Sequence, residues 1–238
     1  MDRICSKFKR LEEVCDLSVG INTGSMKLEM MADRRIDSCY HPCVPGSGIS
    51  RYGRCVTDGW IIYDPAVIKA AGSKGRALPP ERFFRSDKIL VVRTRNTALK
   101  RRIIATVDLD KCYNLNRLSN VLPKTGTDIN TIIGIINSDL WNYLFLTRFF
   151  NYEIKPVYLK EAPVAANFDD QLSALVAQRL TYEDALRAAT LPTRKAALKT
   201  LIASSEALID DYVYALFGIS VVEKAMIKAR LAALPGKW

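Results

Sequence analysis

Histidine is almost absent from this sequence, whose 238 residues include only His41. Ser–His and Cys–His catalytic arrangements need an imidazole beside the nucleophile, so any such scheme would depend on that one residue. The sequence also has no Walker loop and no Gly-x-Gly-x-x-Gly after a predicted strand, the motifs that cradle phosphates in nucleotide-binding enzymes. We therefore expect a binding protein rather than an enzyme, with no cofactor.

Long apolar runs are also missing. The most apolar window, 131–150, contains Asn137, Asp139, Asn142 and Arg148, which would be costly in hydrocarbon. The first ten residues, MDRICSKFKR, carry charges with no apolar run behind them, so we expect no cleaved leader. Both observations predict a soluble, cytoplasmic chain with no membrane partner.

Cysteine is present, with six residues, but its spacing is not typical of a metal site. Cys39 and Cys43 flank His41, and Cys55 is a candidate fourth ligand. Structural zinc sites usually use two cysteine pairs, each spaced by two to four residues. We therefore expect reduced, buried thiols and no bound metal.

Basic charge, by contrast, is abundant and concentrated in one stretch. Residues 74–124 carry 13 Lys/Arg against 4 Asp/Glu, a net of +9 out of the chain's formal +10. A block of one sign favours binding to a polyanion. The alternative is the solvated face of an ordinary basic protein.

The apolar pattern predicts two parts with different secondary structure. Short β-branched runs bounded by turn residues predict strands at 60–63, 88–93 and 103–107. Apolar residues on one face predict a single helix from the capping residue Asp128 through Leu144.

From Asp169 onward the pattern is helical. We expect a first helix with a break near Thr181, then a second capped by Thr193 and ended by Gly218. A capping box of Ser220 and Glu223 then predicts a last helix. The fold class is thus α+β, with a β-rich lobe at 1–165 and a helical segment at 166–238, whose apolar stripe is either a core face or a seam for a partner helix.

Seven short motifs follow one another along the chain. They are GINTG at 20–24, GISRY at 48–52, WIIY at 60–63, KILVVR at 88–93, IINS at 135–138, IKPVYLK at 154–160 and VYALFGI at 213–219. In this order they resemble the target-recognition (specificity) domain of restriction–modification methyltransferases. The resemblance is to the TaqI-like C-terminal specificity domain of fused (type IIG) enzymes, which is related to type I specificity subunits, and it spans about 11–228.

The resemblance implies a domain that reads a short double-stranded DNA sequence for a DNA adenine methyltransferase or endonuclease, which flips the target base. The sequence has no Asn-Pro-Pro-aromatic methylation motif and no Gly-rich methyl-donor loop, so catalysis is expected in a partner subunit or domain. The C-terminal helices would contact that partner or a second copy, which would give a homodimer.

Two other functions remain open from the residues. One is a small metal-dependent nuclease that uses Asp108 and Asp110, although these carboxylates are also placed to balance Arg101, Arg102 and Lys111. The other is a single-strand or RNA-binding protein. That class needs exposed aromatic residues among the basic ones, and the basic stretch offers only Phe83, Phe84 and Tyr113.

The predicted DNA-contacting residues are mostly basic, and most should contact phosphates, which set register without reading sequence. Asn22, Thr23, Arg76 and Arg95 are candidates for base edges. The whole set is Asn22, Thr23, Arg51, Arg54, Lys74, Arg76, Arg82, Arg85, Arg95, Lys100, Arg101, Arg102 and Lys124. We expect Tyr52, Trp60 and Tyr63 to pack in the interior, and Lys88 and Arg93 to pair with Asp87 or Asp64.

Overall fold

The computed structural model describes residues 2–70, 78–94, 101–148, 153–165 and 170–234. Its strands are β1 (Lys9–Arg10), β2 (Cys15–Val19), β3 (Met31–Ala32), β4 (Tyr40–Val44), β5 (Trp60–Ile62), β6 (Lys88–Val92), β7 (Ala105–Asp108), β8 (Tyr113–Asn114), β9 (Leu118–Pro123) and β10 (Pro163–Val164). Its helices are α1 (Asp2–Lys7), α2 (Leu11–Val14), α3 (Lys27–Met30), α4 (Pro65–Ala70), α5 (Arg82–Arg85), α6 (Ile129–Ile136), α7 (Asp139–Thr147), α8 (Pro156–Glu161), α9 (Asp170–Ala188), α10 (Pro192–Leu216) and α11 (Val221–Ala232). This mixture, with the long helices at the C-terminal end, confirms the α+β prediction.

Within these residues the strands form three sheets. The central sheet has the order β2-β9-β6-β7 and is antiparallel throughout. A second sheet has the order β3-β5-β4-β8, with β4 and β8 parallel, and β1 pairs with β10 in a small third one. The predicted strands at 60–63 and 88–93 are confirmed, and the one predicted at 103–107 begins two residues later, at Ala105.

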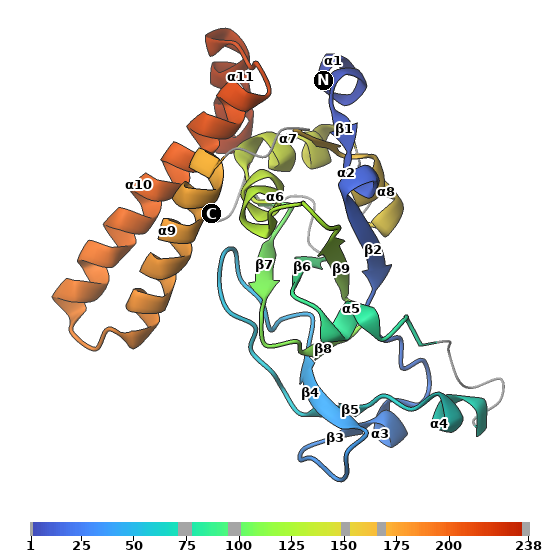
Figure 1. The fold of residues 1–238 in the computed structure, drawn as a ribbon. Coiled ribbons are helices and arrows are strands. Elements are labelled where there is room, and N and C mark those ends of the chain that lie inside the picture. Colours follow the sequence, from blue (N-terminus) through green and yellow to red (C-terminus); the bar gives the residue numbers. More distant parts are fainter. Residues whose placement is uncertain (1, 71–77, 95–100, 149–152, 166–169, 235–238) are drawn as a thin grey trace.

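The largest core lies where α6 and α7 cover one face of the central sheet (Figure 1). Ile89 and Val91 of β6 point into it, as the alternation of side chains along a strand requires. Leu172 and Val176 of α9 belong to the same cluster of buried side chains, as do residues of α10. The core therefore continues across residue 165, and the division into two domains there stays a prediction.

The second sheet, together with α3, α4 and α5, forms what we call the distal lobe, at the bottom of Figure 1. It has its own smaller apolar cluster, which includes Ile21, Met30, Ile61, Phe84 and Tyr113. Helices α9 and α10 pack against each other as a hairpin that diverges from the distal lobe. Across the described residues, no helix combines the length and apolar character that a membrane crossing requires.

The single helix predicted from Asp128 to Leu144 is wrong, because the chain breaks at Asn137 and Ser138. The side-chain amide of Asn137 donates to the carbonyl of Ala105 and accepts from its N–H, both at 2.9 Å, which ties this position to β7. The hydroxyl of Ser138 then accepts from the N–H of Trp141 at 3.2 Å and starts α7 as its N-cap. Asp128 caps α6, as predicted.

The C-terminal helices differ from the prediction in two details. Helix α9 passes through Thr181 without a break, and the Thr181 hydroxyl donates to the carbonyl of Ala177 one turn earlier in the helix. Helix α10 begins at Pro192 with Leu191 as its N-cap, so Thr193 lies inside it. Gly218 has a φ of 61° after α10, and Ser220 and Glu223 form the predicted capping box.

Candidate nucleic-acid interface

The structure divides the predicted DNA-contacting residues into three groups. Lys74, Arg76, Arg95 and Lys100 lie outside the described residues. Arg51, Arg101 and Arg102 are buried or nearly so, whereas Asn22, Thr23, Arg54, Arg82, Arg85 and Lys124 are at least partly exposed.

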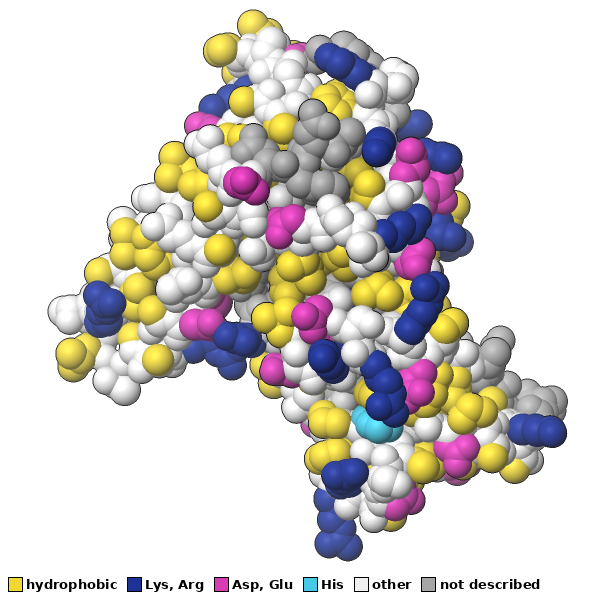
Figure 2. Space-filling model, viewed as in Figure 1, with side chains coloured by type: hydrophobic (Ala, Val, Ile, Leu, Met, Phe, Trp, Pro, Cys, Tyr) yellow, Lys and Arg dark blue, Asp and Glu magenta, His cyan; other side chains and the backbone are white. Residues whose placement is uncertain are grey.

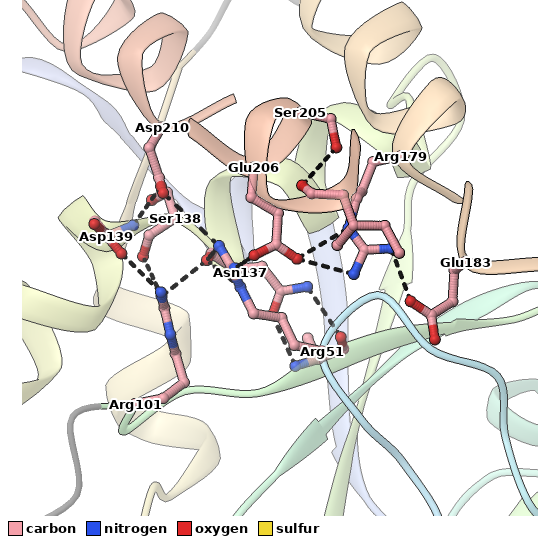
Figure 3. Close-up of polar contacts among 12 residues, drawn as sticks. Arg51, Arg101, Asn137, Ser138, Asp139, Arg179, Glu183, Ser205, Glu206 and Asp210 are labelled. Atoms are coloured by element: carbon pink, nitrogen blue, oxygen red, sulfur yellow. Dashed lines mark hydrogen bonds and ion pairs between the residues drawn. The ribbon is translucent and has the colours of Figure 1, made fainter. Parts of the chain in front are cut away.

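Arg51 joins the central sheet region to the helices instead of facing solvent. Its guanidinium pairs with Glu206 of α10 and donates to the carbonyl of Asn137 through Nε at 3.1 Å and Nη2 at 2.8 Å (Figure 3). Arg179 of α9 reaches the same Glu206 at 2.9 Å, and both guanidinium groups lie about 5 Å from the ring of buried Tyr52. The prediction that Arg51 belongs to a basic surface is therefore wrong, while the interior placement of Tyr52 is confirmed.

Arg101 and Arg102 are also removed from the surface. Arg101 pairs with Asp139 at 2.7 Å and donates to the carbonyl of Asn137 at 3.1 Å, and the residue is 3% exposed. Arg102 is 1% exposed, and its N–H donates to the Asn142 side chain at 2.6 Å. Neither side chain can meet a DNA phosphate without leaving the interior, so both predictions are wrong.

Asp210 of α10 completes this buried group of charges (Figure 3). One of its oxygens accepts from the N–H of Asp139 at 2.6 Å, and Arg51 lies 3.9 Å from the other. Burial, and then the nearby Asp139 carboxylate, raise the pKa of Asp210 to about 7. We call Arg51, Arg101, Asp139, Arg179, Glu206 and Asp210 the charge network.

The side chains of Lys88 and Asp108 are fully buried and form an ion pair with each other. The Nζ of Lys88 lies 2.5 Å from Oδ2 of Asp108, whose oxygens also accept from the N–H groups of Asp110 and Cys112. Lys88 thus pairs with Asp108 rather than Asp87 or Asp64, and Asp108 does not balance Arg101 or Arg102. Arg93 pairs with Glu153, not with the predicted carboxylates.

The described residues give no support to a metal-dependent nuclease that uses Asp108 and Asp110. Asp108 is 1% exposed and its oxygens are occupied, so it cannot present a carboxylate to a metal ion at the surface. Over the part of the chain that the structure describes, no three His, Cys, Asp or Glu side chains are grouped to hold a metal ion.

Three exposed arginines of the predicted set form surface ion pairs. The Arg82 side chain is 60% exposed and pairs with Asp16 at 2.9 Å, and that of Arg85 is 65% exposed and pairs with Glu81 at 2.7 Å. Arg54 pairs with Asp184 of α9, and Lys124 donates to the carbonyl of Glu12. Surface pairs contribute only about 0–1 kcal/mol, so these cations can exchange a carboxylate for a phosphate at little cost.

The distal lobe also exposes cations that are not among the predicted DNA-contacting residues. They are Lys27, Arg34, Arg35, Lys111 and Arg117. Figure 2 shows a band of Lys and Arg side chains, mixed with Asp and Glu, that runs along one side of this face down to the distal lobe. Lys27, Arg34 and Arg35 lie before the basic stretch, in a part of the sequence where positive and negative charges are nearly balanced. Only their position in the fold shows that they belong to the same surface.

Among the hollows that the described residues form on the distal lobe, two are lined by cations and by no carboxylate. The first, about 420 Å³, is lined by Lys27, Pro45, Gly46, Ser47, Val92, Thr94, Leu115 and Arg117, and we call it the basic hollow. A Cβ on Gly46 would lie 2.6 Å from the Cβ of Arg117, so only glycine lets the Arg117 side chain pack there. The second, about 370 Å³, is lined by His41, Arg85, Lys111 and Tyr113, and we call it the aromatic hollow.

The loop that contains Asn22 and Thr23 leads into the basic hollow. Ile21 pairs with Leu115 in its wall, and the N–H of Asn116 donates to the carbonyl of Ile21 at 2.9 Å. The Asn22 side chain accepts from the N–H of Gly24, which has a φ of 55°, so the glycine permits the turn before Lys27. The structure thus brings Asn22, Thr23, Lys27 and Arg117 to one edge of the lobe.

The family model of the TaqI-like C-terminal specificity domain matches residues 41–164. This region includes most of the central sheet and of the distal lobe. The chain belongs to the TaqI-like C-terminal specificity domain family, as its motifs suggested. No curated protein sequence matches it.

Comparison with solved structures finds restriction–modification proteins, and the first of them has a similar fold. The type IIL restriction-modification enzyme MmeI in complex with DNA superposes with a TM-score of 0.57 and 10% identity over 95% of this chain and 37% of that chain. A type I restriction–modification assembly gives 0.47 and 16% over 89% of this chain and 44% of that one. The HsdS subunit from Thermoanaerobacter tengcongensis gives 0.40 and 15%, over 89% and 43% respectively. The chain therefore spans about two fifths of the length of these proteins.

Proposed function

We propose that this chain reads a short sequence of double-stranded DNA as the specificity component of a restriction–modification system. The observation that carries the proposal is the family match over 41–164, because it covers most of the distal lobe and of the sheet that supports it. The exposed cations of the lobe supply the charge that such a surface needs, since phosphate contacts contribute most of the affinity of nonspecific DNA binding.

The two kinds of contact fall to different residues in this proposal. Arg82, Arg85 and Lys111 are placed to meet phosphates and so to set the register on the duplex. The edge that carries Asn22, Thr23, Lys27 and Arg117 is placed to read bases, because amide and guanidinium groups can make paired hydrogen bonds to adenine and guanine. Lys74, Arg76, Arg95 and Lys100 remain predicted members of the same surface.

The chemistry then belongs to a DNA methyltransferase subunit or domain, and the helical hairpin is the surface proposed to contact it. Helix α10 exposes Leu201 by 43% and Leu208 by 55%, seven residues apart on one face. Ala197 and Ser204 extend the same face at spacings of three and four, a seam typical of packing against another helix. The alternative partner for this face of α10 is a second copy of the chain.

Substitution of the seam tests this role better than deletion of the helices would. Leu172 and Val176 of α9 lie in the main core, so removal of the hairpin would expose that core. We expect Leu201→Glu with Leu208→Glu to leave DNA binding intact and to abolish association with the methyltransferase. If light scattering instead shows a wild-type dimer that becomes monomeric in the variant, the seam binds a second copy.

Selection from a randomised duplex library tests the DNA-reading function. The chain alone is incubated with the library at moderate salt, and bound duplexes are recovered and sequenced over several rounds. We expect one motif of a few base pairs to be enriched, because paired hydrogen bonds to bases each discriminate by about 1–3 kcal/mol. A library that stays random, with binding that only weakens as salt rises, would contradict sequence reading by this chain.

A further inference from the structure

The aromatic hollow ends a stack of three rings. The rings of His41 and Tyr113 are nearly parallel, with centroids 4.1 Å apart and planes at 11°. Phe84 stacks on Tyr113 at 4.7 Å, also at 11°. Since two parallel rings on one face of Tyr113 would overlap, His41 and Phe84 lie on opposite faces of it. His41 is thus the outer end of a stack that is anchored in the distal-lobe core through Phe84 and Tyr113.

Two cations border the outer end of this stack. Arg85 and Lys111 line the hollow beside His41 and Tyr113, and no carboxylate contributes to its wall among the described residues. Figure 2 shows the chain's one histidine at the surface, next to Lys and Arg side chains. The hollow therefore offers a flat π face and two positive charges within one space of about 370 Å³.

Glu81 contacts two of the residues that line the hollow. It accepts a hydrogen bond from the Tyr113 hydroxyl at 2.9 Å and pairs with Arg85 at 2.7 Å. Lys111 has a φ of 56°, a left-handed conformation that is costly for a residue with a Cβ.

We propose that the aromatic hollow binds one unstacked nucleotide of DNA, with the base stacked on the outer face of His41 and the phosphate held by Arg85 and Lys111. This rests on the proposed DNA-reading function and adds a nucleotide that has left the duplex stack. The π face favours this ligand over a phosphate of an intact duplex, which would use the two cations and leave the imidazole without a partner. Stacking on an aromatic ring tolerates any base, so the site binds without reading sequence.

The pKa and the proton NMR signal of His41 should both change when a nucleotide binds in the aromatic hollow. Burial, then the neighbouring Arg85, and more weakly Arg35, lower its pKa, while Glu81 acts in the opposite direction. A phosphate bound at Arg85 and Lys111 would offset those positive charges and raise the His41 pKa. Because the chain has one histidine, its imidazole Cε1–H proton gives a single signal in a proton NMR spectrum.

The first experiment titrates the full chain with thymidine monophosphate, thymidine and deoxyribose 5-phosphate while the His41 signal is followed from pH 5 to 8. We expect the nucleotide to shift the signal upfield by ring stacking and to raise the His41 pKa. Thymidine should give only the upfield shift, and the sugar phosphate only the pKa change. A nucleotide effect identical to that of the sugar phosphate, or no effect, would overturn the proposal.

The second experiment compares a paired duplex with the same duplex carrying one extra, unpaired thymidine. We expect wild type to bind the bulged duplex at least about tenfold more tightly, a ratio in the range that one stacked base provides. His41→Trp should keep this preference because it keeps a ring, and His41→Ala should lose it. Equal affinity of wild type for the two duplexes would overturn the proposal.

Two further variants separate binding from folding. Lys111→Gly should weaken the preference for the bulge while the thermal unfolding midpoint stays the same or rises, since glycine relieves the left-handed backbone. Lys199→Ala, on the exposed surface of α10, should change neither. If a duplex motif is enriched but the chain shows no preference for the bulge, the nucleotide site is refuted and the DNA-reading function stands. If the chain binds the nucleotide but no duplex, the DNA-reading function is refuted and the nucleotide site stands.

Discussion

Arginine residues of this chain lie in two different surroundings, which differ in burial and in the number of neighbouring carboxylates. Arg51 and Arg101 are enclosed by Asp139, Glu206 and Asp210, which come from α7 and α10. Arg82 carries the same charge but pairs with Asp16 at an exposed position. The first kind stabilises the fold and the second kind is available to a polyanion.

A matched pair of substitutions separates these roles. Arg51→Ala removes the partner of Glu206 and of the Asn137 carbonyl, so we expect the free energy of unfolding to fall by about 2–4 kcal/mol. Arg82→Ala should change stability by less than about 0.5 kcal/mol, as is usual at exposed sites. Urea unfolding measures both, and DNA affinity should fall for Arg82→Ala while correctly folded Arg51→Ala binds as wild type does. The opposite assignment would show that Arg51 faces the DNA.

Asp210 should make stability depend on pH in the direction opposite to most carboxylates. Its folded pKa is raised to about 7 by burial and by Asp139, despite the nearby Arg51 and Arg101. The unfolded chain releases this proton near pH 4. Between these values the folded state binds more protons, so the contribution of Asp210 to stability is lost as pH rises toward 7.

Asp210→Asn tests this dependence because the amide keeps an oxygen that can accept from the Asp139 N–H but cannot titrate. We expect the variant to be more stable than wild type at pH 8, by about 1–3 kcal/mol, and to lose this advantage at pH 5. Urea unfolding at both pH values gives the difference between the two proteins. A difference that does not change with pH would show that Asp210 is ionised throughout.

At the scale of elements, local signals in the sequence predicted helix ends better than helix continuity. The Ser220 capping box, the Asp128 cap and the glycine after α10 each depend on residues three or four positions apart, and each was found. The break between α6 and α7 depends on Asn137 bonding to Ala105 of β7, which lies 32 residues away in sequence. The pairing of Arg51 with Glu206 spans 155 residues, so no periodicity in the chain could have revealed it.

The contact between α6 and α9 depends on a glycine. A Cβ on Gly134 would lie 2.8 Å from the Val176 side chain and 3.3 Å from that of Leu172. Although valine is a better helix former than glycine, we expect Gly134→Val to lower stability by about 1–3 kcal/mol because it forces the helices apart. Ala203→Val on the exposed surface of α10 is the control for a β-branched residue in a helix. Equal thermal unfolding midpoints for the two variants would mean that α6 and α9 are not in close contact.

At the scale of the whole molecule, the basic stretch of the sequence is not one surface. Its buried members include Lys88 and Arg101, which pair with Asp108 and Asp139, and Arg102, which is 1% exposed. Cations from outside the stretch, such as Lys27 and Arg35, are exposed on the distal lobe. The concentration of charge therefore predicted a polyanion partner for the chain but did not identify the contacting residues.

The number of exposed cations determines how strongly the affinity for DNA should depend on salt concentration. If about six exposed cations replace counterions on DNA, affinity should fall roughly a thousandfold between 50 and 200 mM salt. Fluorescence anisotropy with a labelled duplex measures the slope, and Arg82→Ala should reduce it by about one unit of log–log slope. A slope near zero would mean that the exposed cations do not meet phosphates.

The central claim is that the chain itself distinguishes one DNA sequence from others. Its most direct test is the ratio of affinities for the duplex enriched by selection and for a scrambled duplex of the same composition, measured with the chain alone as salt is raised. We predict a ratio of at least about a hundredfold that persists while both affinities fall, because base contacts depend on salt far less than phosphate contacts do. A ratio near one at every salt concentration would contradict the claim.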